Sequence, residues 1–276
     1  MVTDELIELN GLRFHYRDWQ SSKTHASVED LVLLHGYTGH ARSWDSFAQS
    51  LSENYRVLAL DQRGHGESQW AKPDDYGTTR MVADVKAFVA GLGLTHFSLL
   101  GLSMGGSVSI HYAGEQPAGL NKLVIVDIGP EITTAGASRI QSGVQQSDVF
   151  DSVEEAFERA RAANARAPDE HLRHRVKNNM LKLADGRYTY RYDRALRDQS
   201  ITRPRPSVEE NWQAWKNIAV PTLLLRGSAS DILSQEIANK MVDVHPHCVL
   251  SIVADSGHSI PLDQPEGFLE AVWQFL

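Results

Sequence analysis

Residues 97–106 read FSLLGLSMGG, an apolar run followed at once by Ser103, which has a glycine two residues away on either side. The apolar run predicts a buried strand, and the residues after Gly105 (GSVSIHYAGEQP) predict a helix. A serine between glycines at such a junction indicates a sharp strand-to-helix turn, whose strained backbone tolerates only small neighbours. The turn would hold the Ser103 hydroxyl above the edge of a sheet.

Outside this stretch, short apolar runs alternate with helix-length periodic segments, a pattern typical of βαβ units and a mostly parallel sheet. The period of two around Asn10 and Gly11 predicts an antiparallel hairpin near the start of the chain. A helix is predicted over residues 78–93, which begin at a threonine cap and end at glycines. Further strands are predicted at residues 31–35, 56–60, 97–102, 122–126, 221–226 and 248–253.

The alternation stops between about residue 130 and residue 215. Within this insertion, residues 152–186 are polar and helix-forming, and no run is typical of a strand in a parallel sheet. We therefore expect a helical cap, residues 130–215, packed on an α/β core that consists of residues 1–129 and 216–276.

Composition narrows the class of protein. The chain has 276 residues, enough for one large domain with an insertion, and a formal net charge of −8, which argues against a nucleic-acid-binding surface. The single cysteine, Cys248, cannot form an internal disulfide, and we expect it to be buried in a strand. Because no signal-peptide pattern and no membrane-spanning run occurs, we expect a cytoplasmic protein, and the sequence leaves its oligomeric state open.

A serine hydroxyl is a weak nucleophile near neutral pH and needs a neighbouring base. Among the twelve histidines, His258 has the position that a base requires, because it follows the last predicted strand in a loop between Gly257 and Pro261. A loop at the carboxyl edge of that strand can reach back over the sheet to Ser103. His258 is therefore the predicted base.

The base in turn needs a carboxylate that fixes its tautomer and stabilises the imidazolium. Asp127 ends the predicted strand KLVIVD, and Asp231 lies in RGSASDIL, after the strand that follows the insertion. Both loops belong to the same edge of the sheet, so the residues by themselves leave the two candidates open.

The loop after the first parallel strand, HGYTGHARSW, can supply backbone donors. A tight turn at His35 and Gly36 would point the N–H of Tyr37 toward the same place as the N–H of Met104, the residue after Ser103. Together the two amides would form an oxyanion hole. We expect His35 to hold this loop by hydrogen bonding rather than to act as a base.

The segment DQRGHGES, residues 61–68, is a polar, glycine-rich turn that resembles a phosphate-binding loop. It has neither the lysine of a P-loop nor the G-x-G-x-x-G spacing, so we expect it to support the neighbouring loops instead. No zinc-binding pattern occurs either. No metal and no cofactor is therefore predicted.

The insertion is rich in arginine. Most of these side chains should form a solvated face balanced by acidic residues. One or two that face the pocket could select a carboxylate-bearing substrate. The arginines include Arg159, Arg161, Arg166, Arg173, Arg175, Arg187, Arg191, Arg194 and Arg197.

Six motifs, HGYTG, DQRGHGES, GLSMGG, VDIGP, RGSASDIL and DSGHSIPLDQPEGF, occur in an order and spacing that resembles the α/β-hydrolase superfamily. The resemblance covers nearly the whole chain outside the insertion. It implies an α/β-hydrolase fold, with an eight-stranded, mostly parallel sheet and a helical cap inserted after strand six. It also implies that Ser103 is the nucleophile and His258 the base, and that Tyr37 and Met104 are the oxyanion donors.

The acid is where the sequence departs from the commonest pattern of the family. Most members place it after strand seven in G-x-x-D, but here Ser230 has that position and Asp231 follows one residue later. A subgroup of small esterases places the acid at the end of strand six in a D-I/F-x-P motif, which VDIGP resembles. The resemblance thus favours Asp127, since a shift of one residue turns a side chain to the other side of the chain.

A serine at the turn argues against the dehalogenase and epoxide-hydrolase chemistry of the same superfamily, which needs a carboxylate nucleophile. The leading hypothesis is a carboxylesterase-like serine hydrolase that cleaves a small to medium ester through an acyl-enzyme. Its expected partner is a small-molecule substrate, with no nucleic acid and no membrane. The alternatives are hydrolysis of a C–C or amide-type bond in a catabolic pathway, and a small-ligand receptor on the same fold.

Overall fold

The computed structural model describes residues 1–21 and 28–276. Its strands are β1 (Val2–Leu9), β2 (Leu12–Trp19), β3 (Glu29–Leu34), β4 (Tyr55–Leu60), β5 (Phe97–Leu102), β6 (Leu120–Val126), β10 (Thr222–Gly227) and β11 (Cys248–Val253), and they form one eight-stranded sheet in the order β1-β2-β4-β3-β5-β6-β10-β11. The pairs β1–β2 and β2–β4 are antiparallel, and all other neighbours are parallel. The expected fold, including the hairpin at Asn10 and Gly11, is confirmed.

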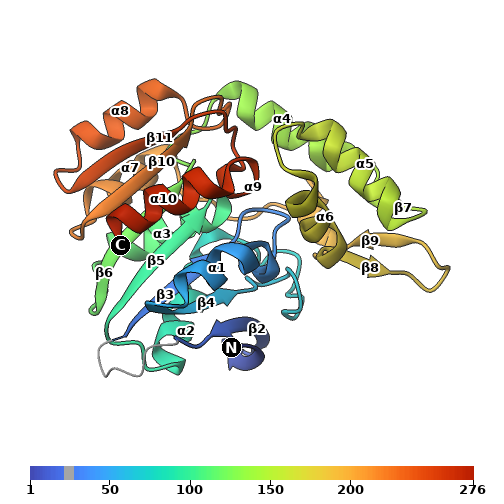
Figure 1. Cartoon of the computed structure of the whole chain (residues 1–276), viewed down its shortest axis with the longest axis horizontal. Helices are drawn as coiled ribbons and strands as arrows, with labels where there is room; N and C mark the ends of the chain where they lie inside the picture. The colour runs from blue at the N-terminus through green and yellow to red at the C-terminus, as the bar shows by residue number, and fades with distance from the viewer. Residues whose placement is uncertain (22–27) are drawn as a thin grey trace.

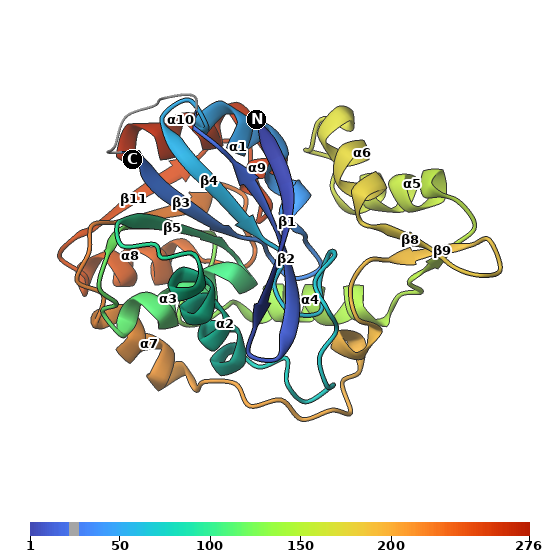
Figure 2. The same cartoon turned by 90° about the horizontal axis from the view of Figure 1, so that it is seen from below.

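Helices cover both faces of this sheet (Figures 1 and 2). One face packs against α2 (Thr78–Gly91), α3 (Met104–Gly114), α7 (Val208–Lys216) and α8 (Gln235–Asp243), and the other against η1 (Ala41–Trp44), α1 (Asp45–Leu51), α9 (Ile260–Asp263) and α10 (Pro265–Phe275). None of the helices in the described ranges is long and apolar enough to cross a membrane.

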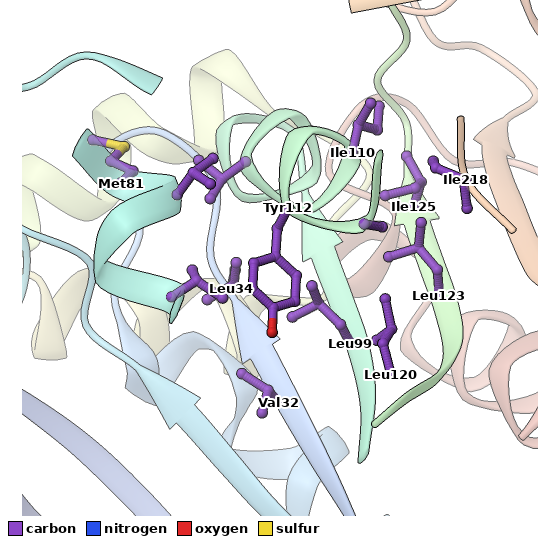
Figure 3. Packing of buried hydrophobic residues seen from close by; sticks show 14 of the residues in the cluster. Val32, Leu34, Met81, Leu99, Ile110, Tyr112, Leu120, Leu123, Ile125 and Ile218 are labelled. Carbon is purple, nitrogen blue, oxygen red and sulfur yellow. The ribbon is translucent and has the colours of Figure 1, made fainter. Parts of the chain in front are cut away.

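Two hydrophobic cores result, one on each face, because successive side chains of a strand point to opposite sides of the sheet. Leu99 lies in the core under α3, and its neighbour Leu100 lies in the core under α10. Figure 3 shows Tyr112 of α3 over Leu34 and Leu99 of the central strands, and all three side chains are buried. This layer fixes α3, and therefore the turn that precedes it. Cys248 is buried as expected.

We call the inserted segment the cap, after its predicted role. It contains α4 (Thr134–Gln145), β7 (Val149–Phe150), α5 (Val153–Ala163), α6 (Asp169–Asn178), β8 (Met180–Lys182), β9 (Tyr188–Tyr190) and η2 (Arg194–Arg197). The expectation of a purely helical insertion is incomplete, because β7, β9 and β8 form a three-stranded antiparallel sheet. Strands of two or three residues are too short to show a period of two in the sequence. The cap has its own apolar cluster, which includes Phe150, Phe157, Leu172, Val176 and Met180.

Helix α7 lies in the cap by sequence but packs with the core. Trp212 and Trp215 belong to the same apolar cluster as α3, and Trp215 Nε1 donates to the carbonyl oxygen of Met241 (2.9 Å). Gly114 of α3 approaches α7 so closely that a Cβ there would lie 2.6 Å from the carbonyl oxygen of Ala214. The division of the chain at residue 215 remains a prediction, and α7 extends the packed core to the N-terminal side of that position.

The segment 61–68 ties several elements together, as expected from its polarity. The buried carboxylate of Asp61 accepts hydrogen bonds from His15 Nδ1 (2.7 Å) and from the N–H of Ala41 (2.6 Å). The buried guanidinium of Arg63 pairs with Asp84 on α2, with Nε 2.6 Å from Oδ2 and Nη2 2.7 Å from Oδ1. The segment therefore joins β2, η1 and α2 below the loops of the sheet edge.

The Arg63–Asp84 pair gives a stability prediction. We expect Asp84→Ala to lower the free energy of unfolding by about 3–5 kcal/mol, because it leaves the buried guanidinium without its counter-charge. Lys86→Ala on the same helix removes an exposed ion pair with Glu115 and should cost less than about 1 kcal/mol. Chemical denaturation of the two variants measures the difference, and equal losses would contradict this account of Arg63.

Candidate active site

Ser103 occupies the turn between β5 and α3. Its backbone has φ 52° and ψ −114°, a conformation that L residues rarely adopt, and its N–H donates to the carbonyl oxygen of Val126 on β6 (3.0 Å). A Cβ on Gly101 would lie 2.4 Å from the carbonyl oxygen of Gly105, and one on Gly105 would lie 2.4 Å from that of Leu34. Both glycines are therefore required by the close approach of the backbone, which explains the pattern in the sequence.

The loop between β11 and α9 brings His258 to Ser103. His258 Nε2 lies 2.9 Å from Ser103 Oγ, and the imidazole is partly buried. The N–H of Gly257 donates to Asp263 Oδ2 (2.8 Å), and Asn164 Nδ2 of the cap donates to the other oxygen of Asp263 (2.7 Å). These two bonds hold the loop in place, so the imidazole is positioned to accept the hydroxyl proton.

Asp127 follows β6, is fully buried and has φ 50°. Its Oδ2 accepts from His258 Nδ1 (2.8 Å) and from Ser230 Oγ (2.5 Å), and its Oδ1 accepts from the N–H of Gly227 (3.0 Å). Because Ser230 Oγ itself accepts from the N–H of Ile232 (3.1 Å), its own proton is free to go to Asp127. Three donors thus fix the orientation of the carboxylate. The sequence assigned no role to Ser230, since only the fold reveals this contact.

Asp231, the alternative acid, has a different partner. It forms a two-point ion pair with Arg139 of α4, with Nε 2.5 Å from Oδ2 and Nη2 3.0 Å from Oδ1, and its side chain is 40% exposed. Asp231 directly follows Ser230 in the turn after β10, yet only Ser230 contacts Asp127. The structure therefore brings Asp127, and not Asp231, into hydrogen-bonding distance of His258.

Tyr37 and Met104 lie on either side of the serine. A Cβ on Gly36 would be 3.3 Å from Ser103 Cβ, so the loop that contains Tyr37 touches the turn. Met104 is the first residue of α3, and the N–H groups of a first helical turn have no carbonyl partner within the helix. The hydroxyl of Tyr37 donates to the carbonyl oxygen of Leu196 in the cap (3.0 Å). Both backbone amides are thus close to Ser103.

His35 holds the Tyr37 loop. Its ring is buried, Nδ1 donates to the carbonyl oxygen of Gly36 (2.8 Å), and Nε2 accepts from the N–H of Gln62 (3.0 Å). Burial lowers the pKa of His35 to about 4, so the ring is neutral near pH 7. Only the neutral ring can accept from Gln62, and the expected structural role of His35 is therefore confirmed.

Ser103 and His258 line a cavity of about 580 Å³. The core contributes the loop after β3, η1, α1 and α10 to its walls, and the cap contributes α4, α5 and α6. The apolar side chains of the lining include Trp44, Phe47, Leu172, Val176 and Phe268. A cavity of this size and apolar lining suits a small to medium organic molecule. Within the described ranges, no group of three His, Cys, Asp or Glu side chains could hold a metal ion.

Three arginines also line the cavity: Arg139, Arg175 and Arg197. Of the arginines considered from the sequence, only Arg175 and Arg197 are among them. One feature of the sequence could have indicated that Arg175 faces the cavity. It lies three residues after Leu172 and next to Val176, which places it beside the apolar face of α6. For Arg197, at the end of η2, no periodic pattern exists.

Known proteins resemble this chain over nearly its whole length. A model of the alpha/beta hydrolase family matches residues 31–271. N-formylmaleamate deformylase of Pseudomonas putida is 30% identical over 98% of this chain and 95% of its own length, and 3-hydroxybutyrate-oligomer hydrolase of Cupriavidus necator is 28% identical over 76% and 75%. An alpha/beta hydrolase structure from Novosphingobium aromaticivorans has a TM-score of 0.87 and 28% identity, and the alignment covers 99% of this chain and 97% of that one.

The sheet, the serine turn and these matches define a hydrolase with an α/β architecture. The chain belongs to the alpha/beta hydrolase family.

The buried histidines give a prediction about pH. Burial holds the pKa of His35, His40 and His245 at about 4 and that of His65 at about 3. In the unfolded chain each takes up a proton near pH 6.5. The unfolded state therefore binds more protons between about pH 6.5 and pH 4, and the free energy of unfolding should fall by about 1.4 kcal/mol per pH unit for each group as the pH drops. Burial opposes the shift of His15, but Asp61 raises its pKa above the ordinary value. The pKa of His174 is raised mainly by Asp45. Neither group therefore contributes in this window.

Urea denaturation at several pH values across this window tests the account. We expect His35→Gln to reduce the slope of unfolding free energy against pH by about one proton, because it removes one ring that must stay neutral. The exposed His96 serves as the control, and His96→Gln should leave the slope unchanged. An identical slope in the wild-type protein and in His35→Gln would show that the His35 ring is not held neutral.

Proposed function

We propose that the protein is a serine hydrolase that cleaves a small to medium carboxylic ester through an acyl-enzyme. The observation that supports this most strongly is the continuous chain of hydrogen bonds from Ser103 Oγ through His258 to Asp127 (2.9 and 2.8 Å), which opens into the cavity. A hydroxyl, an imidazole and a carboxylate in this order form the general machinery of acyl transfer.

In the first step, Ser103 Oγ forms a bond to the carbonyl carbon of the substrate while His258 Nε2 takes the hydroxyl proton. The carbonyl oxygen becomes an oxyanion, which the amides of Tyr37 and Met104 stabilise. Each such donor is worth roughly 3 kcal/mol in the transition state. The C–O bond then breaks, and the imidazolium of His258 gives its proton to the departing alcohol.

In the second step, water attacks the acyl group on Ser103 and His258 takes a proton from that water. The tetrahedral intermediate collapses, the acid leaves, and the proton returns from His258 to Ser103 Oγ. Asp127 stabilises the imidazolium in both steps and keeps Nδ1 protonated. The ester and water are the only reactants, so the proposal includes no cofactor.

Asp127 is the proposed acid because its carboxylate touches His258 and is itself held by Ser230 and Gly227. Asp231 is the less favoured candidate, since its carboxylate is engaged by Arg139.

Cleavage of an amide-type bond is a second candidate. The same groups act on any carbonyl with a departing group that His258 can protonate. The relative that is 30% identical over nearly the full length of both chains acts, by its name, on N-formylmaleamate, whereas the other acts, by its name, on 3-hydroxybutyrate oligomers. Rates on 4-nitrophenyl butyrate, N-formylmaleamate and a vinylogous keto acid would separate ester, amide and C–C bond hydrolysis.

A fluorophosphonate probe tests the nucleophile. We expect the probe to label the wild-type protein, and Ser103→Ala to abolish labelling and to lower the hydrolysis rate by more than about 1000-fold. Ser46, on the cavity wall, provides the matched control, and Ser46→Ala should still be labelled. Labelling that survives in Ser103→Ala would refute the proposal. A ligand that binds the wild-type protein without turnover would favour a receptor instead.

The hydrolysis assay also distinguishes the two candidate acids, Asp127 and Asp231. We expect Asp127→Asn to lower kcat by roughly 10⁴-fold, because an amide at this position stabilises the wrong tautomer of His258. Asp231→Asn should change kcat by less than about threefold. If only Asp231→Asn were inactive, the assignment of the acid would be reversed.

A further inference from the structure

Helix α6 forms one wall of the cavity and contacts η1. Two hydrogen bonds dock it there: Asn179 Nδ2 donates to the carbonyl oxygen of Thr38 (2.9 Å), and His40 Nε2 donates to that of Arg175 (3.2 Å). The backbone of Arg175 is therefore fixed beside the loop that contains Tyr37. The residues of α6 that line the cavity are His171, Leu172, His174, Arg175 and Val176.

Arg175 differs from the other arginines of the cavity because none of the described carboxylates forms an ion pair with its guanidinium. Arg139 pairs with Asp231, and Arg197 binds the hydroxyl of Tyr192 and lies 3.8 Å from Asp148. Among the residues that the structure describes, no carboxylate forms a hydrogen bond or ion pair with the guanidinium of Arg175. The Arg175 side chain therefore lines the same cavity as Ser103, and none of its N–H groups donates to a described carboxylate.

The acidic groups nearby already have other partners. Both carboxylate oxygens of Asp263 accept hydrogen bonds, one from Gly257 and one from Asn164. Asp45, which lines the cavity, binds Arg17 and His174. The second acidic residue of the lining, Glu266, is exposed, lies next to Ser50 and Leu269 in a shallow outer pocket, and forms no ion pair with Arg175.

An uncompensated guanidinium in such a place is costly for the folded protein. Burial lowers the pKa of Arg175 although Tyr190 and Asp263 act in the opposite direction, so these two groups do not fully compensate the cation. Proteins keep charged groups away from water mainly when a partner is present, and here the missing partner would be a molecule in the cavity. The planar fork of a guanidinium matches the two oxygens of a carboxylate better than any other common anion except phosphate.

We propose that Arg175 binds a carboxylate of the substrate, so that the enzyme selects esters or amides that bear a second, negatively charged end. This inference rests on the proposed function, because it places the charged group in the cavity that contains Ser103. It makes Arg175 the residue that distinguishes anionic from neutral substrates, while the hydrogen-bonded chain of Ser103, His258 and Asp127 acts on both.

Two esters that differ only at the far end of the acyl group test the proposal. 4-Nitrophenyl butyrate ends in a methyl group, and mono-4-nitrophenyl succinate has a carboxylate in the same place. We expect the ratio of kcat/KM for the succinyl ester to kcat/KM for the butyryl ester to fall by about 10- to 100-fold in Arg175→Gln, the effect of losing a charged hydrogen bond. Arg175→Lys should recover part of the ratio. Lys177→Gln, an exposed cation on the same helix, should leave it unchanged.

An unchanged ratio in Arg175→Gln would overturn the proposal, and so would an equal fall in Lys177→Gln. Calorimetry keeps the test independent of catalysis: Ser103→Ala should bind succinate more tightly than uncharged succinamide, and adding Arg175→Gln should remove that preference. If neither ester is hydrolysed but succinate still binds through Arg175, the proposed function fails and the carboxylate site stands. If both esters are hydrolysed but succinate shows no dependence on Arg175, the carboxylate site fails alone.

Discussion

The close approach of backbone at the turn after β5 is the constraint on which the rest of the site depends. Gly101, Gly105 and the end of β3 pass so near one another that no Cβ fits at either glycine, and Ser103 is held at a positive φ as a result. Since β5 lies between β3 and β6 near the middle of the sheet, the loops that follow both neighbours end beside the serine. The sheet order therefore decides which residues can reach the hydroxyl.

Around this turn, the neutral ring of His35 fixes a loop, whereas the carboxylate of Asp127 orients the imidazole of His258. His35, kept neutral by burial, joins the loop after β3 to Gln62 and so fixes the amide of Tyr37. Asp127 is surrounded by donors from β10, its following loop and the imidazole. The cap adds a third kind of contact, because α6 docks on the loop after β3 through backbone carbonyl groups. The cavity is thus enclosed by parts of the chain that are distant in sequence.

The sequence alone predicts much of this arrangement, because strand patterns and glycine spacing are local. The parallel strands, the turn at Ser103 and the loop position of His258 all follow from short stretches. The residues alone leave the choice between Asp127 and Asp231 open, since both follow strands at the same sheet edge, and the resemblance of VDIGP to a family motif favours Asp127. Only the fold shows that Arg139 engages Asp231. The role of Ser230 depends on a contact across 103 residues of chain. Arg175 could be named from the sequence only as one of several arginines, because its place in the cavity depends on how α6 docks on the loop after β3. The short strands of the cap leave no periodic pattern.

The separate apolar cluster of the cap has a consequence for how such enzymes diverge. Phe157, Leu172 and their neighbours form a cluster separate from both cores of the sheet, and Leu262 of α9 packs against it. Exchanges on the cavity side of α5 and α6 can therefore alter the shape and charge of the enclosed space while the packing beneath Ser103 stays intact. Such exchanges keep the site intact as long as the contacts of the cap with Tyr37 and Asp263 are retained.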